Sequence, residues 1–203
     1  MHSVIIFSGW AEKPTTTVSS SPRRSSSSQG RRVHLTLQER RDREMAKKQE
    51  PRVKLPPVEQ VGIVVKDMER AMEYYSSTFG WGPFQVMELE MKGATYRGQP
   101  CDCRLKLAFA RSGPIEIELI QVLEGETPHT EFLREKGEGL QHLRFSVDDI
   151  DGTLAKLAKE GIEPVFQHSY PEIGISFAYL NTDKIGGVMI ELIEIKKRKS
   201  GDK

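Results

Sequence analysis

Two carboxylates, one imidazole and one amide occupy matched positions in a chain that repeats itself. Gln60 and His142 lie 82 residues apart, each at the head of a short apolar run. The tetrapeptide Ile-Glu-Leu-Ile then occurs twice, with Glu118 in its first copy and Glu191 in its second. Such a repeat indicates an internal duplication. These four side chains carry nitrogen and oxygen donors that a divalent metal ion can use.

The elements that must position these side chains follow the same repeat. In the first module, 58–124, Asp67 is suited to cap a helix that Gly80 ends. In the second, 140–196, Asp149 and Gly161 have the same roles. Apolar runs and turn residues predict strands beginning at Gln60 and at 84–91, 104–110, 115–122, 140–147, 164–168, 176–180 and 188–195, with a helix at 127–136 joining the modules. The predicted fold is α+β, with two tandem βαβββ modules.

Composition and charge narrow the classes of function. No apolar run approaches the roughly 20 residues that span a bilayer, so we expect no membrane partner. Residues 1–57 carry 12 Lys/Arg and 5 Asp/Glu, a net of +7, whereas 58–203 carry 18 and 24, a net of −6. The acidic balance of the folded part argues against a nucleic-acid surface. Cys101 and Cys103 are too close for an ordinary disulfide, which favours a reducing cytoplasm.

The two ends of the chain differ from the modules in amino-acid composition. Residues 1–57 are rich in Ser, Thr and charged side chains and lack an amphipathic stripe, so we expect a disordered basic leader. A transit peptide fits only as far as Arg32, because acidic residues follow it. Translation from Met45 is an equal alternative, which would make 1–44 non-native. Residues 197–203 form a basic tail.

Three motifs resemble the vicinal oxygen chelate superfamily, which includes glyoxalase I, methylmalonyl-CoA epimerase, extradiol dioxygenases and antibiotic-resistance proteins. They are Gln-Val-Gly-Ile-Val-Val-Lys-Asp at 60–67, Gln-His-Leu-Arg-Phe-Ser-Val-Asp-Asp-Ile at 141–150 and Gly-Gly-Val-Met-Ile-Glu-Leu-Ile at 186–193. The resemblance spans about residues 58–196. It implies that the two modules form a cupped mixed sheet around one divalent metal ion.

Carried over by position, the resemblance assigns the metal to Gln60, Glu118, His142 and Glu191. This ligand set is the one glyoxalase I uses, whereas the amino-acid sequences of the motifs resemble those of methylmalonyl-CoA epimerase more closely. Zn, Co, Ni or Mn suits such a sulfur-free set. In these relatives the metal polarises a carbonyl while a carboxylate moves the adjacent proton. Glu191 is the first candidate base, with Glu118 opposite it and Asp102 as an acid for the second face.

The resemblance therefore favours an isomerase of epimerase type, acting beside a carbonyl such as that of an acyl-CoA thioester. The alternatives are a glyoxalase I-like lactoylglutathione lyase and a non-catalytic binding or resistance protein. We expect a cytoplasmic homodimer with a small-molecule substrate. The remaining polar and aromatic residues are not assigned to the metal site. His129 and His168 are expected on the surface, and Trp81 is expected to pack against apolar neighbours. Solvated charges, or contacts to a substrate tail, are expected of Arg97, Arg104 and Lys106.

Overall fold

The duplicated pattern folds as two βαβββ units in a computed structural model, which describes residues 36–41, 51–184 and 186–196. A connecting helix, α3, lies between the units in sequence, as predicted. The first unit contains β1 (Gln60–Val64), α2 (Met68–Phe79), β2 (Gln85–Tyr96), β3 (Gln99–Ser112) and β4 (Ile115–Glu124). After α3 (Pro128–Glu135), the second contains β5 (Gly139–Ser146), α4 (Ile150–Ala158), β6 (Pro164–Tyr170), β7 (Ile175–Leu180) and β8 (Met189–Ile195).

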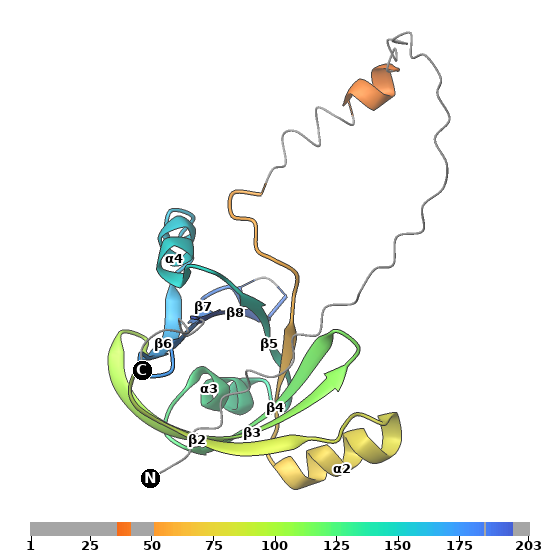
Figure 1. Cartoon of the computed structure of the whole chain (residues 1–203), viewed down its shortest axis with the longest axis vertical. Helices are drawn as coiled ribbons and strands as arrows, with labels where there is room; N and C mark the ends of the chain where they lie inside the picture. The colour runs from red at the N-terminus through yellow and green to blue at the C-terminus, as the bar shows by residue number, and fades with distance from the viewer. Residues whose placement is uncertain (1–35, 42–50, 185, 197–203) are drawn as a thin grey trace, which may run out of the picture. The chain divides into compact units, whose positions relative to one another are not determined.

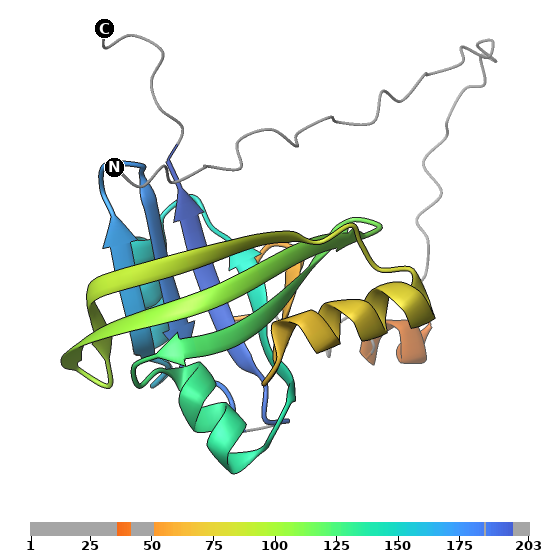
Figure 2. The ribbon, with the colours of Figure 1, turned by 90° about the horizontal axis from the view of Figure 1, so that it is seen from below.

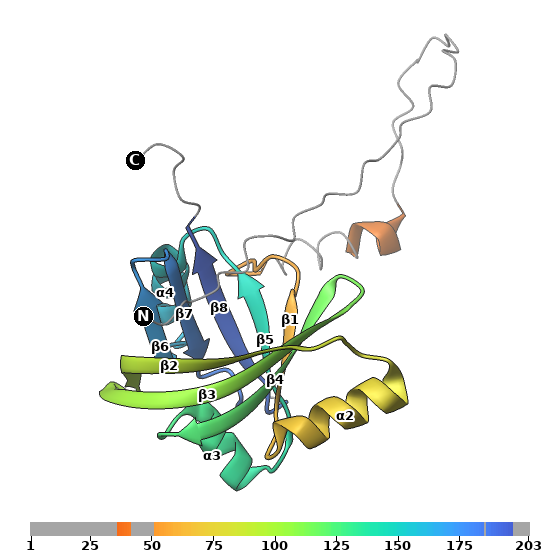
Figure 3. The same cartoon turned by 60° about the horizontal axis from the view of Figure 1, so that its bottom comes forward.

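The eight strands form one mixed sheet that closes on itself in the order β1-β4-β3-β2-β6-β7-β8-β5 (Figures 1 and 3). Within each unit the first and last strands are parallel, β1 with β4 and β5 with β8. The units meet where β1 runs antiparallel to β5. On the other side β2 and β6 are joined through two residue pairs, Thr95 with Gln167 and Tyr96 with Phe166. The cupped mixed sheet is thus confirmed, and a short seam between β2 and β6 closes it into a barrel.

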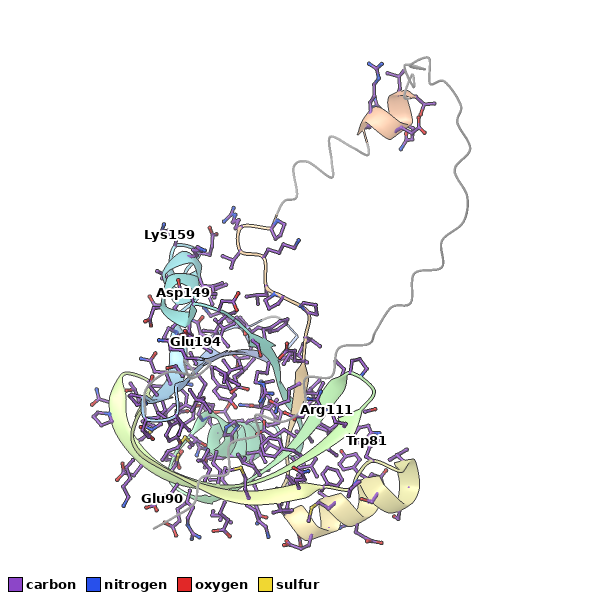
Figure 4. All side chains as sticks on the ribbon, viewed as in Figure 1. Trp81, Glu90, Arg111, Asp149, Lys159 and Glu194 are labelled. Carbon is purple, nitrogen blue, oxygen red and sulfur yellow. The ribbon has the colours of Figure 1, made fainter. Side chains whose placement is uncertain are left out.

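Both predicted helix caps are formed. The Asp67 side chain accepts a hydrogen bond from the backbone N–H of Arg70, and the helix ends at Gly80 with φ 70°. This left-handed conformation favours glycine. Asp149 accepts from the N–H of Gly152 at the start of α4, and Figure 4 labels it at the opposite end of that helix from Lys159. The caps set the direction in which each helix leaves the strand before it.

β2 and β3 are longer than the predicted strands at 84–91 and 104–110. They continue into a tight hairpin whose turn residues, Arg97 and Gly98, both have positive φ, 49° and 77°. Charged residues on the outer face of these strands weaken the apolar signal by which strands are recognised. As a result, Cys101 and Cys103 lie within β3, and Cys103 is buried.

Three apolar clusters hold the elements together. One fills the barrel, where Phe166 and Met91 are almost fully buried. The second packs α2 on the outside of β3 and β4, and the third lies under α4. Figure 2 shows α2 running beside the strands of the first unit. Val53 and Leu55 pack against the third cluster, so residues before the sequence boundary at 58 also contribute apolar contacts.

The rest of the predicted leader is described in part. Residues 37–41 form one helical turn that Thr36 and Glu39 cap reciprocally, each side chain accepting from the other's backbone N–H. Residues 1–35, 42–50 and 197–203, with most of the leader and the basic tail, lie outside the described residues. No helix in the described part of the chain is long and apolar enough to cross a membrane.

Candidate metal centre

Strand register brings the four predicted ligands into the barrel on the neighbouring strands β4, β1, β5 and β8. Side chains two residues apart on a strand point to the same face, so paired residues form rows across the sheet. The first row holds Glu116, Gln60, Arg144 and Glu191. The next row holds Glu118, Gly62, His142 and Met189. The predicted ligands therefore alternate between two adjacent rows.

The ligand atoms converge on one ring nitrogen. His142 Nε2 lies 3.2 Å from Glu191 Oε2, 3.4 Å from Glu118 Oε2 and 3.4 Å from Gln60 Oε1. Candidate ligand atoms of the two carboxylates and the imidazole all lie within 4.8 Å of one another. Gln60 and His142 are fully buried, and Glu118 and Glu191 are 7% and 6% exposed. The four groups form one enclosed polar cluster, which we call the ligand cluster.

Gly62 makes room for the imidazole. It sits on β1 between Glu118 and His142, and an added Cβ would lie 1.9 Å from His142 Cε1. A Cβ there would overlap the ring itself, and the fully buried imidazole would have to move away to relieve the overlap. Only glycine fits at this position while His142 keeps its place.

Gly62→Ala is expected to lower the free energy of unfolding by about 1–3 kcal/mol, the usual cost of overpacking a core. Chemical denaturation monitored by circular dichroism measures this loss. In a His142→Ala background the ring is gone, so the same substitution should cost little. An undiminished cost in that background would show that the glycine is needed for another reason.

A β-bulge orients His142. In the β1–β5 pairing Gly62 faces His142 and Ile63 faces Leu140, which leaves Gln141 as an extra residue on β5. Gln141 and His142 are consequently both fully buried, although neighbouring strand residues normally alternate. Gln141 Oε1 lies 2.8 Å from His142 Nδ1, and its Nε2 donates to Met189 Sδ at 3.3 Å. With Nδ1–H bonded to Gln141, the tautomer leaves Nε2 to face the ligand cluster.

The electrostatics of the cluster favour a cation. Burial by itself lowers the pKa of His142, but hydrogen bonds and charges from Glu118 and Glu191 outweigh it and raise that pKa to about 9. Burial raises the pKa of Glu118, while the contact with His142 opposes this. Without a metal, His142 therefore holds a proton at neutral pH and supplies the positive charge that the carboxylates require.

The donor set fits a divalent metal ion. Glu191 Oε2 is buried and, apart from the charged contact with His142 Nε2 at 3.2 Å, has no hydrogen-bond partner among the described residues, so a metal could take it once His142 gives up its proton. Around the cluster stand three carboxylates, those of Glu116, Glu118 and Glu191, and the guanidinium of Arg144. With His142 neutral they leave two uncompensated negative charges, which a divalent ion would neutralise. Oxygen and imidazole donors without sulfur are suited to Zn, Co, Ni or Mn.

Asp102 is not brought to the ligand cluster. It is exposed on β3, and its Oδ1 accepts a hydrogen bond from the N–H of Gly93 at 2.8 Å. The strands predicted at 84–91 and 104–110 leave Asp102 outside a strand, but it lies within β3, where alternation turns Cys103 inward and Asp102 outward. The expected acid for the second face therefore does not come from this position.

The predicted surface position of His129 is wrong. This residue of α3 is 1% exposed, and its ring centroid lies 5.1 Å from that of Tyr179 and 6.3 Å from that of His142. Burial lowers its pKa to about 3, so the ring is neutral. His168 is half-buried against Tyr170, at 4.5 Å between centroids. The periodicity of one short helix does not reveal which of its polar residues packs against a barrel.

The other predicted surface and packing residues have local partners. Trp81 stacks on Tyr75 with 4.9 Å between ring centroids, as a packing residue (labelled in Figure 4). Three cations on the β2–β3 hairpin pair with carboxylates. These are Arg97 with Glu131, Arg104 with Glu88 and Glu124, and Lys106 with Glu69.

Four residues beside the ligand cluster were not predicted. Glu116 and Arg144 each lie two residues from a ligand on the same strand face, so strand parity was the signal that could have revealed them. Gln141 enters through the bulge, which the sequence does not mark. Tyr179 faces Glu191 across β7 and β8, its ring 5.0 Å from His142, and burial raises its pKa well above the usual value.

The structure is a duplicated βαβββ sheet that encloses a ligand cluster, and comparison with known proteins identifies the class of protein that has this arrangement. Residues 59–179 match the model of the Glyoxalase/Bleomycin resistance protein/Dioxygenase superfamily, and the chain belongs to that superfamily. The resemblance to the vicinal oxygen chelate proteins is thereby confirmed.

Among individual relatives, the chain is similar to the mitochondrial methylmalonyl-CoA epimerase of Mus musculus. The two are 27% identical over 146 residues, which cover 68% of this chain and 73% of the mouse protein. The protein YqjC of Bacillus subtilis is 24% identical over 142 residues, 68% of this chain and 92% of YqjC. A solved structure of Streptomyces coelicolor methylmalonyl-CoA epimerase in complex with 2-nitronate-propionyl-CoA has a TM-score of 0.54 at 20% identity, covering 71% of this chain and all of that one. At that identity the structural likeness is one of fold.

Proposed function

We propose that this protein is a metal-dependent isomerase of epimerase type, which moves a proton at a carbon next to the carbonyl of an acyl-CoA thioester. The observation that carries the proposal is the convergence of Gln60, Glu118 and Glu191 on His142 Nε2 inside the barrel. The similarity to methylmalonyl-CoA epimerases supports the substrate class. Gln60, Glu118, His142 and Glu191 would hold the metal.

When bound, the ion would polarise the substrate carbonyl and stabilise the enolate. The protein's own carboxylates then move the proton. Glu191 is the proposed base, because apart from the charged contact with His142 Nε2 its buried Oε2 forms no hydrogen bond among the described residues, and it becomes available to accept a proton once a metal replaces the imidazole proton. Epimerisation needs a second group that returns a proton on the opposite face. With Asp102 on the outside of the barrel, that role passes to Glu118, which approaches His142 from β4 while Glu191 approaches from β8.

Entry of a substrate requires the barrel to open, because the ligand cluster is enclosed. The β2–β6 seam should open most easily, because it has the fewest paired residues. It has two residue pairs, whereas every other neighbouring strand pair has at least five. We therefore expect the backbone amides of Thr95 and Tyr96 to exchange with heavy water faster than those of β1 and β5. Hydrogen exchange followed by mass spectrometry measures this difference. Equal protection of the two regions would place the entrance elsewhere.

The decisive test combines metal analysis of the purified protein with deuterium wash-in from heavy water into a panel of acyl-CoA thioesters. Incorporation at the α-carbon, dependent on the metal, is the expected result. A glyoxalase I-like lyase is the second candidate, because its ligand set is the one expected here, and it would instead convert a thiol hemithioacetal. Tight binding of a small molecule with neither reaction would indicate the non-catalytic alternative and contradict the proposal.

The proposal extends to assembly and location. We propose a homodimer, since Tyr74, Phe79 and Val86 expose apolar surface on and beside α2. A cytoplasmic setting accords with the two free cysteines. Light scattering coupled to size-exclusion chromatography tests the dimer, and a mass of one chain would contradict it.

A further inference from the structure

The amide of Gln60 can serve a metal through its oxygen and not through its nitrogen. Its two ends therefore must not exchange places. Gln60 Nε2 donates to Glu116 Oε1 at 2.8 Å, and Gln60 Oε1 faces the ligand cluster, 3.4 Å from His142 Nε2. A carboxylate can only accept hydrogen bonds, so the amide atom beside Glu116 has to be the NH₂ group.

Without Glu116, the opposite orientation of the Gln60 amide, with its NH₂ group toward the ligand cluster, becomes favourable. Glu118 and Glu191 also only accept, and both lie within 3.4 Å of the His142 nitrogen that Gln60 faces. Their negative charge attracts the NH₂ group, which is the wrong atom for a metal. The orientation of Gln60 is thus a competition between the carboxylate outside the ligand cluster and the two within it.

Arg144 braces the outer carboxylate. Its guanidinium donates to Glu116 Oε1 at 2.9 Å, the same oxygen that accepts from Gln60. The two side chains are 18% and 22% exposed, enough burial for the pair to keep a defined geometry. Gln60 is the register partner of both, so Glu116, Gln60 and Arg144 lie in one row over β4, β1 and β5.

The second half of the chain has a comparable contact at the same position. Glu116 lies two residues before the ligand Glu118, and Met189 lies two residues before the ligand Glu191. Met189 Sδ accepts from Gln141, whose oxygen in turn contacts His142 Nδ1. In the first half, Glu116 contacts the predicted ligand Gln60 directly. In the second half, Met189 contacts the predicted ligand His142 through Gln141.

We propose that Glu116, braced by Arg144, is a positioning residue that keeps the oxygen of Gln60 toward the metal. The inference rests on the proposed metal site. Removing the carboxylate should therefore weaken metal binding chiefly through Gln60, and to a smaller extent through the lost negative charge.

A double-mutant cycle on the full chain tests this, with Co²⁺ as the probe. The affinity for Co²⁺ is measured by competition with a chromophoric chelator, and the visible absorption bands report the ligands. Glu116→Ala should weaken binding by about 10–100-fold, the scale of lost outer contacts to metal ligands. Against a Gln60→Ala background the same change should have less than about a 3-fold effect, because coupling vanishes when the intermediary is gone. Glu116→Ala and Gln60→Ala should share one altered spectrum.

Two further variants separate positioning from charge and from folding. Glu116→Gln loses the charge but keeps an oxygen that accepts from Gln60, so its spectrum should match that of the parent and its affinity should fall less than that of Glu116→Ala. Glu124→Ala removes a carboxylate from the exposed end of the same strand and should change neither. An equal loss from Glu116→Ala in both backgrounds, or no loss at all, would overturn the inference and leave the proposed function standing. A parent chain that binds no Co²⁺ would overturn both.

Discussion

Replacing Glu191 with glutamine is expected to slow exchange of a substrate's α-proton with solvent by a factor on the order of 10² or more, the scale of losing a positioned general base. The amide keeps an oxygen that can take the position of Oε2 beside His142, so metal content should change little. What it removes is the basicity of the carboxylate. Deuterium wash-in, paired with metal analysis of the same sample, measures both quantities.

Glu194→Gln is the matched control. Glu194 is also a buried acid of β8, but it accepts from the N–H of Ile150 at the start of α4, on the outer side of the sheet. Exchange should survive in this variant. If Glu191→Gln exchanges like the parent, the base is another group, and Glu118→Gln becomes the next variant to measure.

Removal of the metal is expected to lower the melting temperature by roughly 5–10 °C when the free ion stands at about 100 times its dissociation constant, because a ligand that binds the native state alone then contributes about 2.7 kcal/mol. The stabilisation arises because the ligands come from both units, on β1, β4, β5 and β8. His142→Ala should abolish the response to chelators. Thermal denaturation with and without a chelator measures it.

The pH dependence of metal binding follows from His142. Its pKa is raised to about 9 without metal, so the ion must displace a proton at neutral pH. Affinity should therefore rise with pH by about tenfold per unit up to roughly pH 9, and level off above it. The proton's own contribution to stability has the opposite direction, being complete below the unfolded pKa of about 6.5 and lost as pH rises through about 9. Metal affinity that does not change between pH 7 and 9 would contradict this protonation state.

The contrast between Asp102 and Glu116 shows where inference from the sequence reached its limit. Asp102 is predicted as an acid for the second face, but a two-residue turn at 97–98 places it on the outer face of a strand. Glu116 is not among the predicted residues, although it has the same strand parity as Glu118. Counting is reliable within a strand, where alternation is fixed, and fails across a turn of unknown length.

By itself the sequence determined the duplication, the order of the elements, the capped helix starts at Asp67 and Asp149 and the strands that carry the four predicted ligands. These features are local, since apolar periodicity and capping residues act over a few neighbours. The tertiary structure alone decided that a bulge turns Gln141 inward, that Gly62 leaves space for the imidazole, that His129 is buried, and that Glu116 and Arg144 meet over Gln60. Each of these depends on which strands become neighbours and in what register, which is set by packing between segments far apart in the chain.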